Sequence, residues 1–367
     1  MEAKECIYIW IDDDEAEAKS HAKLLNSKRI SYIDSTITLV INVLRPISFE
    51  SLISDISNMH YDGLILDLRL DSTVFRAPEF AQAVRSSAAD RNRTIRLKDV
   101  PIVLTSSDIK IVESFSGDKV GKDLFDWRML KEEIPDRYKF FAEKLVCLAK
   151  AYTETNVPYE NPQKALSKLL GISDSELDVA VSSDFGTKDT FFPLHEYILF
   201  IERELIERPG LLVDEETFAA RLGISLPTVK EDIIQTEEWN KIKGTFSNAS
   251  YTGVLSCSFK RWWGQKVNEY FQELTNQSIV TIDARTRVAL LKEKLNLQSI
   301  EVAKPIEGNR SYRYWSICEA QQEPLDPLEG LRITEPEPKS WQSHRYLSKK
   351  GRDTSSGYKF QVNPSDL

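Results

Sequence analysis

The segment Asp62-Gly-Leu-Ile-Leu-Asp67-Leu-Arg-Leu combines a turn, a short apolar run and an acidic residue. Asp62-Gly63 is a turn dipeptide, and the apolar run 64–66 is typical of a buried β-strand. Asp67 comes directly after that run, at the point where the chain leaves the strand. The segment therefore predicts a buried strand with a carboxylate at its carboxyl end.

Strand-like and helix-like runs alternate in this way through residues 1–151. Predicted strands are 7–11, 36–44, 64–66, 101–104 and 127–130, and predicted helices are 15–29, 49–59, 78–90, a segment near 108–116, and 135–151. Such alternation indicates a parallel sheet with helices on both faces. Five units predict a flavodoxin-like, doubly wound α/β fold, in which ligands bind at the carboxyl ends of the strands.

Polar residues occupy those strand ends. Asp12 and Asp13 follow the first predicted strand, Asp67 the third, Thr105 the fourth and Lys131 the fifth. Crowded carboxylates raise one another's pKa, and a divalent cation with oxygen ligands, such as Mg²⁺, removes that repulsion. A metal beside Asp67 would neutralise charge on a transferring phosphoryl group, while the lysine and the threonine would bind its other oxygens.

These segments resemble the motifs of response-regulator receiver domains, the phosphoacceptor modules of two-component systems. The resembling segments are 9–14, 62–70, 101–106 and 125–131, and the resemblance covers residues 5 to about 150. With its departures from the usual pattern, this part of the chain resembles the divergent receivers found in bacterial conflict and antiphage loci.

The resemblance implies a role for each matching residue. A histidine kinase would phosphorylate Asp67, and Mg²⁺ would be held by Asp12, Asp13, Asp67 and the backbone carbonyl of Arg69. Thr105 would be the switch residue, which responds when Asp67 is phosphorylated, and Lys131 would bind the phosphoryl group.

The chain also departs from the family pattern. Asp71 and Glu132 stand where the family usually has proline, and the motif spacings imply insertions near 30–48 and 85–99. Two other interpretations stay open for the acidic residues. Asp12 to Asp14 could only cap the helix that follows, because negative charge is favourable there. The domain could also be a receiver fold that is never phosphorylated.

The rest of the chain is predicted to hold a linker at 152–163, a mainly helical, winged-helix-like region at 164–300 and an irregular or β-rich region at 301–367. Residues 218–229 fit a helix-turn-helix, with Ala219 and Gly223 at the turn spacing. Residues 211–240, however, contain seven acids and two bases. Because phosphate contacts dominate DNA affinity, DNA binding is not expected, and a protein-binding domain is favoured.

Two further motifs have a functional and a structural interpretation. Residues 259–264, Phe-Lys-Arg-Trp-Trp-Gly, could stack on bases or bind anions. A buried tryptophan pair at helical spacing is favoured instead. His195-Glu196 is similar to the His-Glu pair of histidine kinases, but the residues that follow do not fit, so a structural histidine is favoured.

Composition limits the remaining possibilities. The chain has 367 residues, a net charge of −9 and four scattered cysteines, for which reduced thiols in a cytoplasmic protein are expected. It has no apolar run long enough for a membrane span and no secretory signal. No nucleotide-binding loop or hydrolase motif is found, so no enzyme beyond autophosphotransfer is predicted.

The predicted function is a phosphoacceptor that passes or buffers a signal through contact with a protein effector. The resemblance to divergent receivers implies a setting in antiphage defence. The alternatives are a DNA-binding response regulator and a phosphorylation-dead structural subunit of a defence complex.

Overall fold

The computed structural model describes residues 4–26, 29–31, 36–70, 76–89, 97–107, 123–153, 162–185, 192–334, 336–354 and 360–361. Their contacts divide the chain into two compact units. The first unit comprises residues 1–177, 182–201 and 253–258, and the second comprises 178–181, 202–252 and 259–367. The division falls after Ile201, whereas the sequence predicted a boundary at the linker 152–163.

The first unit is built on a six-stranded sheet. Its strands are β1 (Lys4–Ile11), β2 (Arg29–Ser31), β3 (Thr36–Leu44), β4 (Gly63–Asp67), β5 (Ile102–Ser106) and β6 (Trp127–Leu130). They are arranged in the order β2-β3-β1-β4-β5-β6, and only β2 is antiparallel to its neighbour. The five predicted strands are therefore confirmed, with the doubly wound flavodoxin-like order.

The edge strand β2 is an addition that the sequence did not reveal. The helix predicted over 15–29 is wrong at its carboxyl end, because the observed helix stops at Leu25 and residues 29–31 form β2. The other helices that flank the sheet are close to their predicted ranges. They are α2 (Phe49–Ser57), α3 (Ala77–Ala89) and α6 (Ile134–Thr153), and the helix that stops at Leu25 is α1 (Glu15–Leu25). The helix predicted near 108–116 lies outside the described residues.

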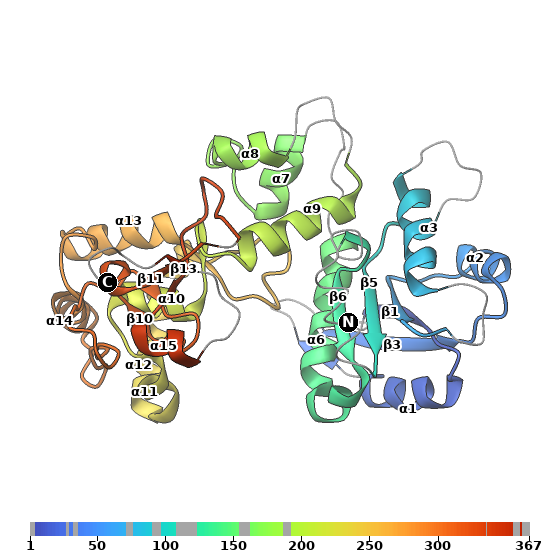
Figure 1. Ribbon diagram of the computed structural model, residues 1–367, viewed down its shortest axis with the longest axis horizontal. Coiled ribbons are helices and arrows are strands. Elements are labelled where there is room, and N and C mark those ends of the chain that lie inside the picture. The colour runs from blue at the N-terminus through green and yellow to red at the C-terminus, as the bar shows by residue number, and fades with distance from the viewer. Residues whose placement is uncertain are drawn as a thin grey trace. The chain divides into compact units, whose positions relative to one another are not determined.

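Alternation along β1 explains why helices cover both faces of the sheet. Ile9 and Ile11 belong to the apolar core that includes residues of α2 and α3. Tyr8 and Trp10 point to the other face, where the Tyr8 hydroxyl donates to the carbonyl of Leu145 on α6 at 2.7 Å. Helices α6 and α3 accordingly lie on opposite sides of the strands (Figure 1). A strand covered on both faces has to be apolar, as β1 is from Cys6 to Ile11, whereas its first residues, Lys4 and Glu5, are exposed.

The chain then adds helices to the first unit. They are α7 (Pro162–Leu170) and α9 (Leu194–Phe200), with α8 (Val179–Phe185) at the division between the units. The prediction of four reduced cysteines is wrong for two of them, because Cys147 of α6 forms a disulfide with Cys257 across 110 residues of sequence. Cys6 and Cys318 are buried free thiols. The disulfide fastens the segment 253–258 to the first unit.

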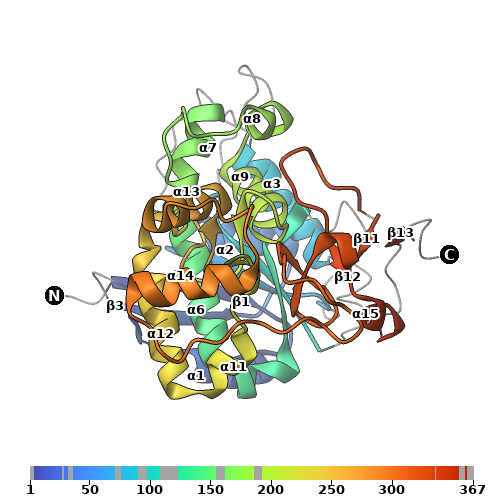
Figure 2. The same cartoon turned by 90° about the vertical axis from the view of Figure 1, so that its left-hand side faces the viewer.

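The second unit is helical first and then β-rich, as predicted. Its elements are η2, a π-helix (Ile201–Ile206), β7 (Leu212–Val213), α10 (Glu215–Leu222), α11 (Leu226–Glu231), α12 (Ile233–Thr245), η3 (Ser247–Ala249), β8 (Trp262–Trp263), α13 (Gly264–Thr275), α14 (Ala284–Leu295), β9 (Ser316–Ile317), β10 (Pro324–Leu325), η4 (Pro327–Glu329), β11 (Leu331–Ile333), β12 (Tyr346–Leu347), α15 (Lys349–Thr354) and β13 (Phe360–Gln361). In Figure 2 helices α11 to α14 lie on one side of this unit, and β11, β12 and α15 lie on the other.

Two predictions about this unit have different outcomes. The helix-turn-helix order is present, since α10 ends at Gly223, whose φ of +85° is the left-handed conformation that favours glycine, and α11 follows. The tryptophan pair is not at helical spacing, because Trp262 and Trp263 form strand β8, paired with β7. Trp262 is buried and stacks on Phe218, with ring centroids 4.7 Å apart.

Candidate functional site

The structure gathers the predicted polar residues at the carboxyl ends of the parallel strands. Asp12 and Asp13 follow β1, Asp67 ends β4, and Lys131 follows β6. Asp67 lies opposite Thr105 in the pairing of β4 with β5. Carboxylate oxygens of Asp12, Asp13 and Asp67 all lie within 4.8 Å of one another. The fold thus brings together residues that are separated by up to 119 positions in sequence, from Asp12 to Lys131.

Lys131 is the centre of the charge arrangement. Its Nζ lies 2.9 Å from Asp12 Oδ2, 2.9 Å from Asp67 Oδ1 and 2.8 Å from Glu17 Oε2. The ion pairs with the two aspartates join three strand ends. Glu17, on the first turns of α1, was not predicted. Its side chain reaches the lysine because of where α1 begins and which way the helix is rotated. The pattern of polar residues at strand ends does not predict either.

Burial makes these charges depend on one another. Asp12, Asp67 and Lys131 are buried, while Asp13 is half-buried. Burial raises the pKa of Asp67 to about 6, against the lowering effect of Lys131. Burial also raises the pKa of Asp12. Burial alone would lower the pKa of Lys131, but its three carboxylate partners outweigh that effect and raise it.

The surroundings of the two buried aspartates fix their orientation. Asp12 accepts from the indole Nε1 of Trp10 at 3.2 Å and from the backbone N–H of Asp14 at 2.9 Å. Asp67 Oδ2 accepts from the backbone N–H of Arg69 at 2.9 Å. Asp14 itself caps α1 by accepting from the N–H of Glu17. Capping therefore belongs to Asp14, which leaves Asp12 and Asp13 to the strand-end cluster.

The donor set fits a hard divalent cation. Asp12, Asp13 and Asp67 offer carboxylate oxygens only, and such ligands suit Mg²⁺. In the part of the chain that the structure describes, these three form the one group of acidic, histidine or cysteine residues close enough to hold a metal. The backbone carbonyl of Arg69 stays a predicted ligand.

Thr105 is buried, and its hydroxyl oxygen has no hydrogen-bond partner among the described residues. A buried hydroxyl without a partner costs roughly 1–3 kcal/mol. Because Thr105 lies opposite Asp67, a group attached to that carboxylate could supply the missing acceptor. The orphaned hydroxyl is thus consistent with the predicted switch role.

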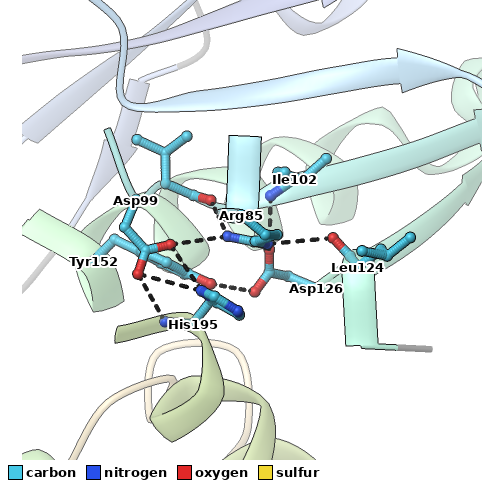
Figure 3. A network of polar contacts seen from close by, with 8 residues as sticks. Arg85, Asp99, Ile102, Leu124, Asp126, Tyr152 and His195 are labelled. Atoms are coloured by element: carbon cyan, nitrogen blue, oxygen red, sulfur yellow. Dashed lines mark hydrogen bonds and ion pairs between the residues drawn. The ribbon is translucent and has the colours of Figure 1, made fainter. Parts of the chain in front are cut away.

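A second polar cluster lies at the opposite ends of the strands and includes His195 (Figure 3). Its centre is the buried Arg85 of α3, whose Nη2 lies 2.5 Å from Asp126 and whose Nη1 lies 3.0 Å from Asp99. Asp126 also accepts from the N–H of Ile102 at 2.6 Å and from the hydroxyl of Tyr152. Each buried charge in the cluster therefore has an opposite charge or a hydrogen-bond donor beside it.

His195 joins this cluster from α9. Its backbone N–H donates to Asp99 Oδ2 at 3.1 Å, and its ring Nδ1 lies 3.1 Å from Asp99 Oδ1 (Figure 3). Burial opposes ionisation of Asp99, but the hydrogen bond from His195 and the charge of Arg85 hold the pKa of that carboxyl below its usual value. The favoured prediction for His195, a structural histidine with satisfied hydrogen bonds, agrees with these contacts.

No family model matches the chain, and no curated protein matches it. Among solved structures, an adenylate cyclase from Rhodopirellula baltica is 12% identical, with 40% of this chain and 92% of that chain covered and a TM-score of 0.28. A protein described as a response regulator from Chloroflexus aurantiacus is 19% identical, with coverages of 38% and 98% and a TM-score of 0.24. NtrX from Brucella abortus, in complex with ATP, is 13% identical, with coverages of 68% and 56% and a TM-score of 0.30.

Likeness at these TM-scores carries no argument about function, so the fold assignment rests on the strand order itself. Among the helices of the described residues, none has the length and apolar character needed to cross a membrane.

Proposed function

We propose that this chain is a two-component phosphoacceptor, in which Asp67 accepts a phosphoryl group from a histidine kinase. The observation that carries the proposal is the strand-end cluster, where Asp12, Asp13 and Asp67 meet within 4.8 Å and Lys131 lies 2.9 Å from two of them. A nucleophile, a cation and oxygen ligands for a metal are the parts that phosphoryl transfer to a carboxylate needs.

In the proposed step, a carboxylate oxygen of Asp67 forms a bond to phosphorus. The P–N bond of a phosphohistidine breaks, and its electron pair stays on the imidazole nitrogen of the kinase. Lys131 binds a phosphoryl oxygen, and the hydroxyl of Thr105 donates to another. Each contact stabilises charge that the transfer places beside Asp67.

Asp12, Asp13 and Asp67, with the carbonyl of Arg69, would hold Mg²⁺. The metal would supply neutralisation of the phosphoryl charge when bound. Hydrogen bonds within the chain hold the two buried carboxylates in place. Trp10 and the N–H of Asp14 orient Asp12, and the N–H of Arg69 orients Asp67.

The test is intact-mass measurement of the purified chain after incubation with Mg²⁺ and acetyl phosphate. Wild type should gain one phosphoryl group, whereas Asp67→Asn and a sample with excess EDTA should gain none. Asp55→Asn, an exposed aspartate on α2, is the matched control and should gain the group as wild type does. Because a small donor can fail where a kinase succeeds, transfer from a phosphorylated histidine-kinase domain forms a second arm. No gain in either arm would leave the phosphorylation-dead subunit as the surviving alternative.

Output through protein contact is part of the proposal, and the charge of the second unit supports it. In the helix-turn-helix segment, Glu231 ends α11 and Asp232 caps α12, and the one lysine there, Lys230, pairs with Glu216 at 3.3 Å. Such a surface repels phosphates. A shift of duplex DNA at low salt that disappears at high salt would favour the transcription-factor alternative instead.

The setting in antiphage defence enters the proposal by resemblance alone. Phage plaque counts on cells that carry wild type or Asp67→Asn, together with the neighbouring genes, would test it. Equal plaque counts for the two proteins would remove a phosphorylation-dependent role in defence.

A further inference from the structure

Lys131 has no spare donor for a phosphoryl oxygen. A lysine ammonium group has three N–H donors. Its Nζ lies within 2.8–2.9 Å of three carboxylates, from Asp12, Asp67 and Glu17. A phosphoryl oxygen can therefore reach the ammonium group only if one of the three carboxylates withdraws.

Burial decides which carboxylate withdraws. The side chains of Asp12 and Asp67 are 1% and 7% exposed, whereas that of Glu17 is 41% exposed. A buried carboxylate that leaves the lysine finds little water to solvate its charge, which is strongly unfavourable. Water can solvate the half-exposed carboxylate of Glu17 after it leaves the lysine, even though Lys131 itself is buried. Asp67 carries the phosphoryl group itself, so the choice is between Asp12 and Glu17, and Glu17 is the partner that leaves because water can solvate it.

The position of Glu17 on α1 allows this exchange without movement of the sheet. Its backbone N–H is held by Asp14 at 3.0 Å, so the helix start stays fixed while the side chain turns. His21 lies one turn further along α1, with its Nε2 4.0 Å from Glu17 Oε1, but burial lowers the pKa of this imidazole, so it does not replace Lys131 as a cation. His21 in turn stacks on Trp10, with ring centroids 6.1 Å apart.

We propose that Glu17 is a positioning residue that occupies the phosphoryl-binding donor of Lys131 in the unphosphorylated protein and is displaced by the phosphoryl group. The inference rests on the proposed function and adds a regulator to the same site. No proton or covalent bond changes in the exchange: one N–H of Lys131 moves from Glu17 Oε2 to a phosphoryl oxygen. Glu17 lowers both the rate at which the site gains a phosphoryl group and the affinity with which it holds one.

The test compares three variants with wild type in Mg²⁺. Glu17→Gln removes the charge, Glu17→Asp keeps the charge but shortens its reach, and Glu15→Gln is the control. Glu15 lies on the same helix, is similarly exposed and pairs with Lys19 instead of Lys131. Phosphoryl gain from acetyl phosphate is followed by intact mass, and binding of beryllofluoride, a phosphoryl mimic, is followed by ¹⁹F NMR.

Glu17→Gln and Glu17→Asp should both gain the phosphoryl group and bind beryllofluoride about two- to fivefold better than wild type, the range expected for loss of an exposed ion pair. Glu15→Gln should match wild type. The beryllofluoride arm reads a contact of the bound group, which a merely structural change in α1 would not improve.

Three outcomes would overturn the inference. If Glu17→Gln behaves as Glu15→Gln does, Glu17 does not compete for the lysine, and the proposed function survives. If Glu17→Gln is faster but Glu17→Asp equals wild type, general charge repulsion acts and not displacement from Nζ. If wild type neither gains a phosphoryl group from either donor nor binds beryllofluoride, the proposed function fails and the inference fails with it.

Discussion

At the residue scale, the fold buries Asp67 in surroundings that disfavour the ionised form of its carboxyl group. Burial raises its pKa from 3.8 to about 6, although Lys131 lies 2.9 Å away. The folded chain therefore binds more protons than the unfolded chain between about pH 4 and 6. The contribution of Asp67 to the free energy of unfolding therefore falls as the pH rises from about 4 to 6. Above that window the ionised carboxylate destabilises the folded chain.

Asp67→Asn should accordingly raise the free energy of unfolding of the metal-free protein at pH 7, by at most about 3 kcal/mol for a shift of this size. The gain should shrink as the pH falls from about 6 toward 3, because the wild-type carboxyl is protonated in both states only below its unfolded pKa of 3.8. Urea unfolding of both proteins in EDTA, at a series of pH values, measures the difference.

The same measurement in Mg²⁺ supplies the control, since a bound cation would stabilise wild type and narrow the difference. Asp55→Asn, a substitution at an exposed aspartate of α2, is the matched variant and should unfold as wild type does. A variant Asp67→Asn that is less stable than wild type at both pH 7 and pH 4 would show that the ion pair with Lys131 outweighs the cost of burial.

Residues at strand ends could be placed from the sequence because the end of an apolar run fixes their position in a parallel sheet. Asp12, Asp67, Thr105 and Lys131 are such residues, and the structure brings them to one edge. Glu17 could not be placed, because its contact depends on the start and phase of α1 and on a lysine 114 residues away. No local pattern carries that information.

At the scale of elements, one carboxylate, that of Asp99, links α9 to α3, in addition to the apolar side chains that α9 buries. Asp99 receives both the N–H and the ring of His195 on α9 and pairs with Arg85 of α3. Asp126 has a different role, since it neutralises Arg85 within the core and also holds Tyr152 at the end of α6. The two aspartates thus flank the same arginine but hold different elements.

Substitution of the two aspartates should separate these roles. Asp126→Asn should lower the free energy of unfolding by about 3–5 kcal/mol, because it leaves the charge of a buried arginine without its main partner. Asp99→Asn should cost about 1–3 kcal/mol. Its main effect should be faster amide hydrogen exchange in 194–200, with the strands of the sheet unchanged.

Hydrogen exchange by mass spectrometry, with thermal unfolding of each variant, makes the comparison. His195→Ala provides the matched control, since it removes the ring contact and keeps the backbone N–H, so its effect on α9 should be intermediate. Equal protection of α9 in wild type and Asp99→Asn would mean that apolar packing alone holds that helix.

Elements with a complete local signal were predicted within a few residues. The apolar strands and the helix that begins at the Ser48 cap are examples, because burial and capping are encoded nearby. Strand β2 has only three residues and gains its identity from pairing with β3, so its signal is non-local. Trp262-Trp263 was misassigned for the same reason, since its strand exists through pairing with β7.

At the scale of the whole molecule, the two compact units do not follow the sequence boundary at 152–163. Composition marks that stretch as a linker, but the helices after it return to the first unit, and so do residues 253–258 from a distant part of the chain. A polar, proline-containing stretch indicates where the chain is irregular. It does not indicate which unit the following helices join, because that depends on contacts such as Asp99 with His195.

The disulfide between Cys147 and Cys257 joins residues 253–258 covalently to α6 of the first unit. It closes a loop of more than one hundred residues, and in the chain-entropy account such a loop is worth about 4 kcal/mol or somewhat more. Cys147→Ser with Cys257→Ser should therefore lower the free energy of unfolding by about 2–5 kcal/mol. Reduction of wild type should cause the same loss.

Peptide mapping after tryptic digestion without reductant tests the link directly. Peptide 145–150 should be joined to peptide 244–260, and thiol titration of the denatured chain should find two free thiols before reduction and four after it. Cys6→Ser is the control for loss of a buried thiol without loss of the link. Such disulfides persist in oxidising compartments and are rare in the cytosol. Four free thiols in protein purified from the cytoplasm would thus restore the sequence-based expectation. Joined peptides would instead make redox state a condition for docking of residues 253–258 in the first unit.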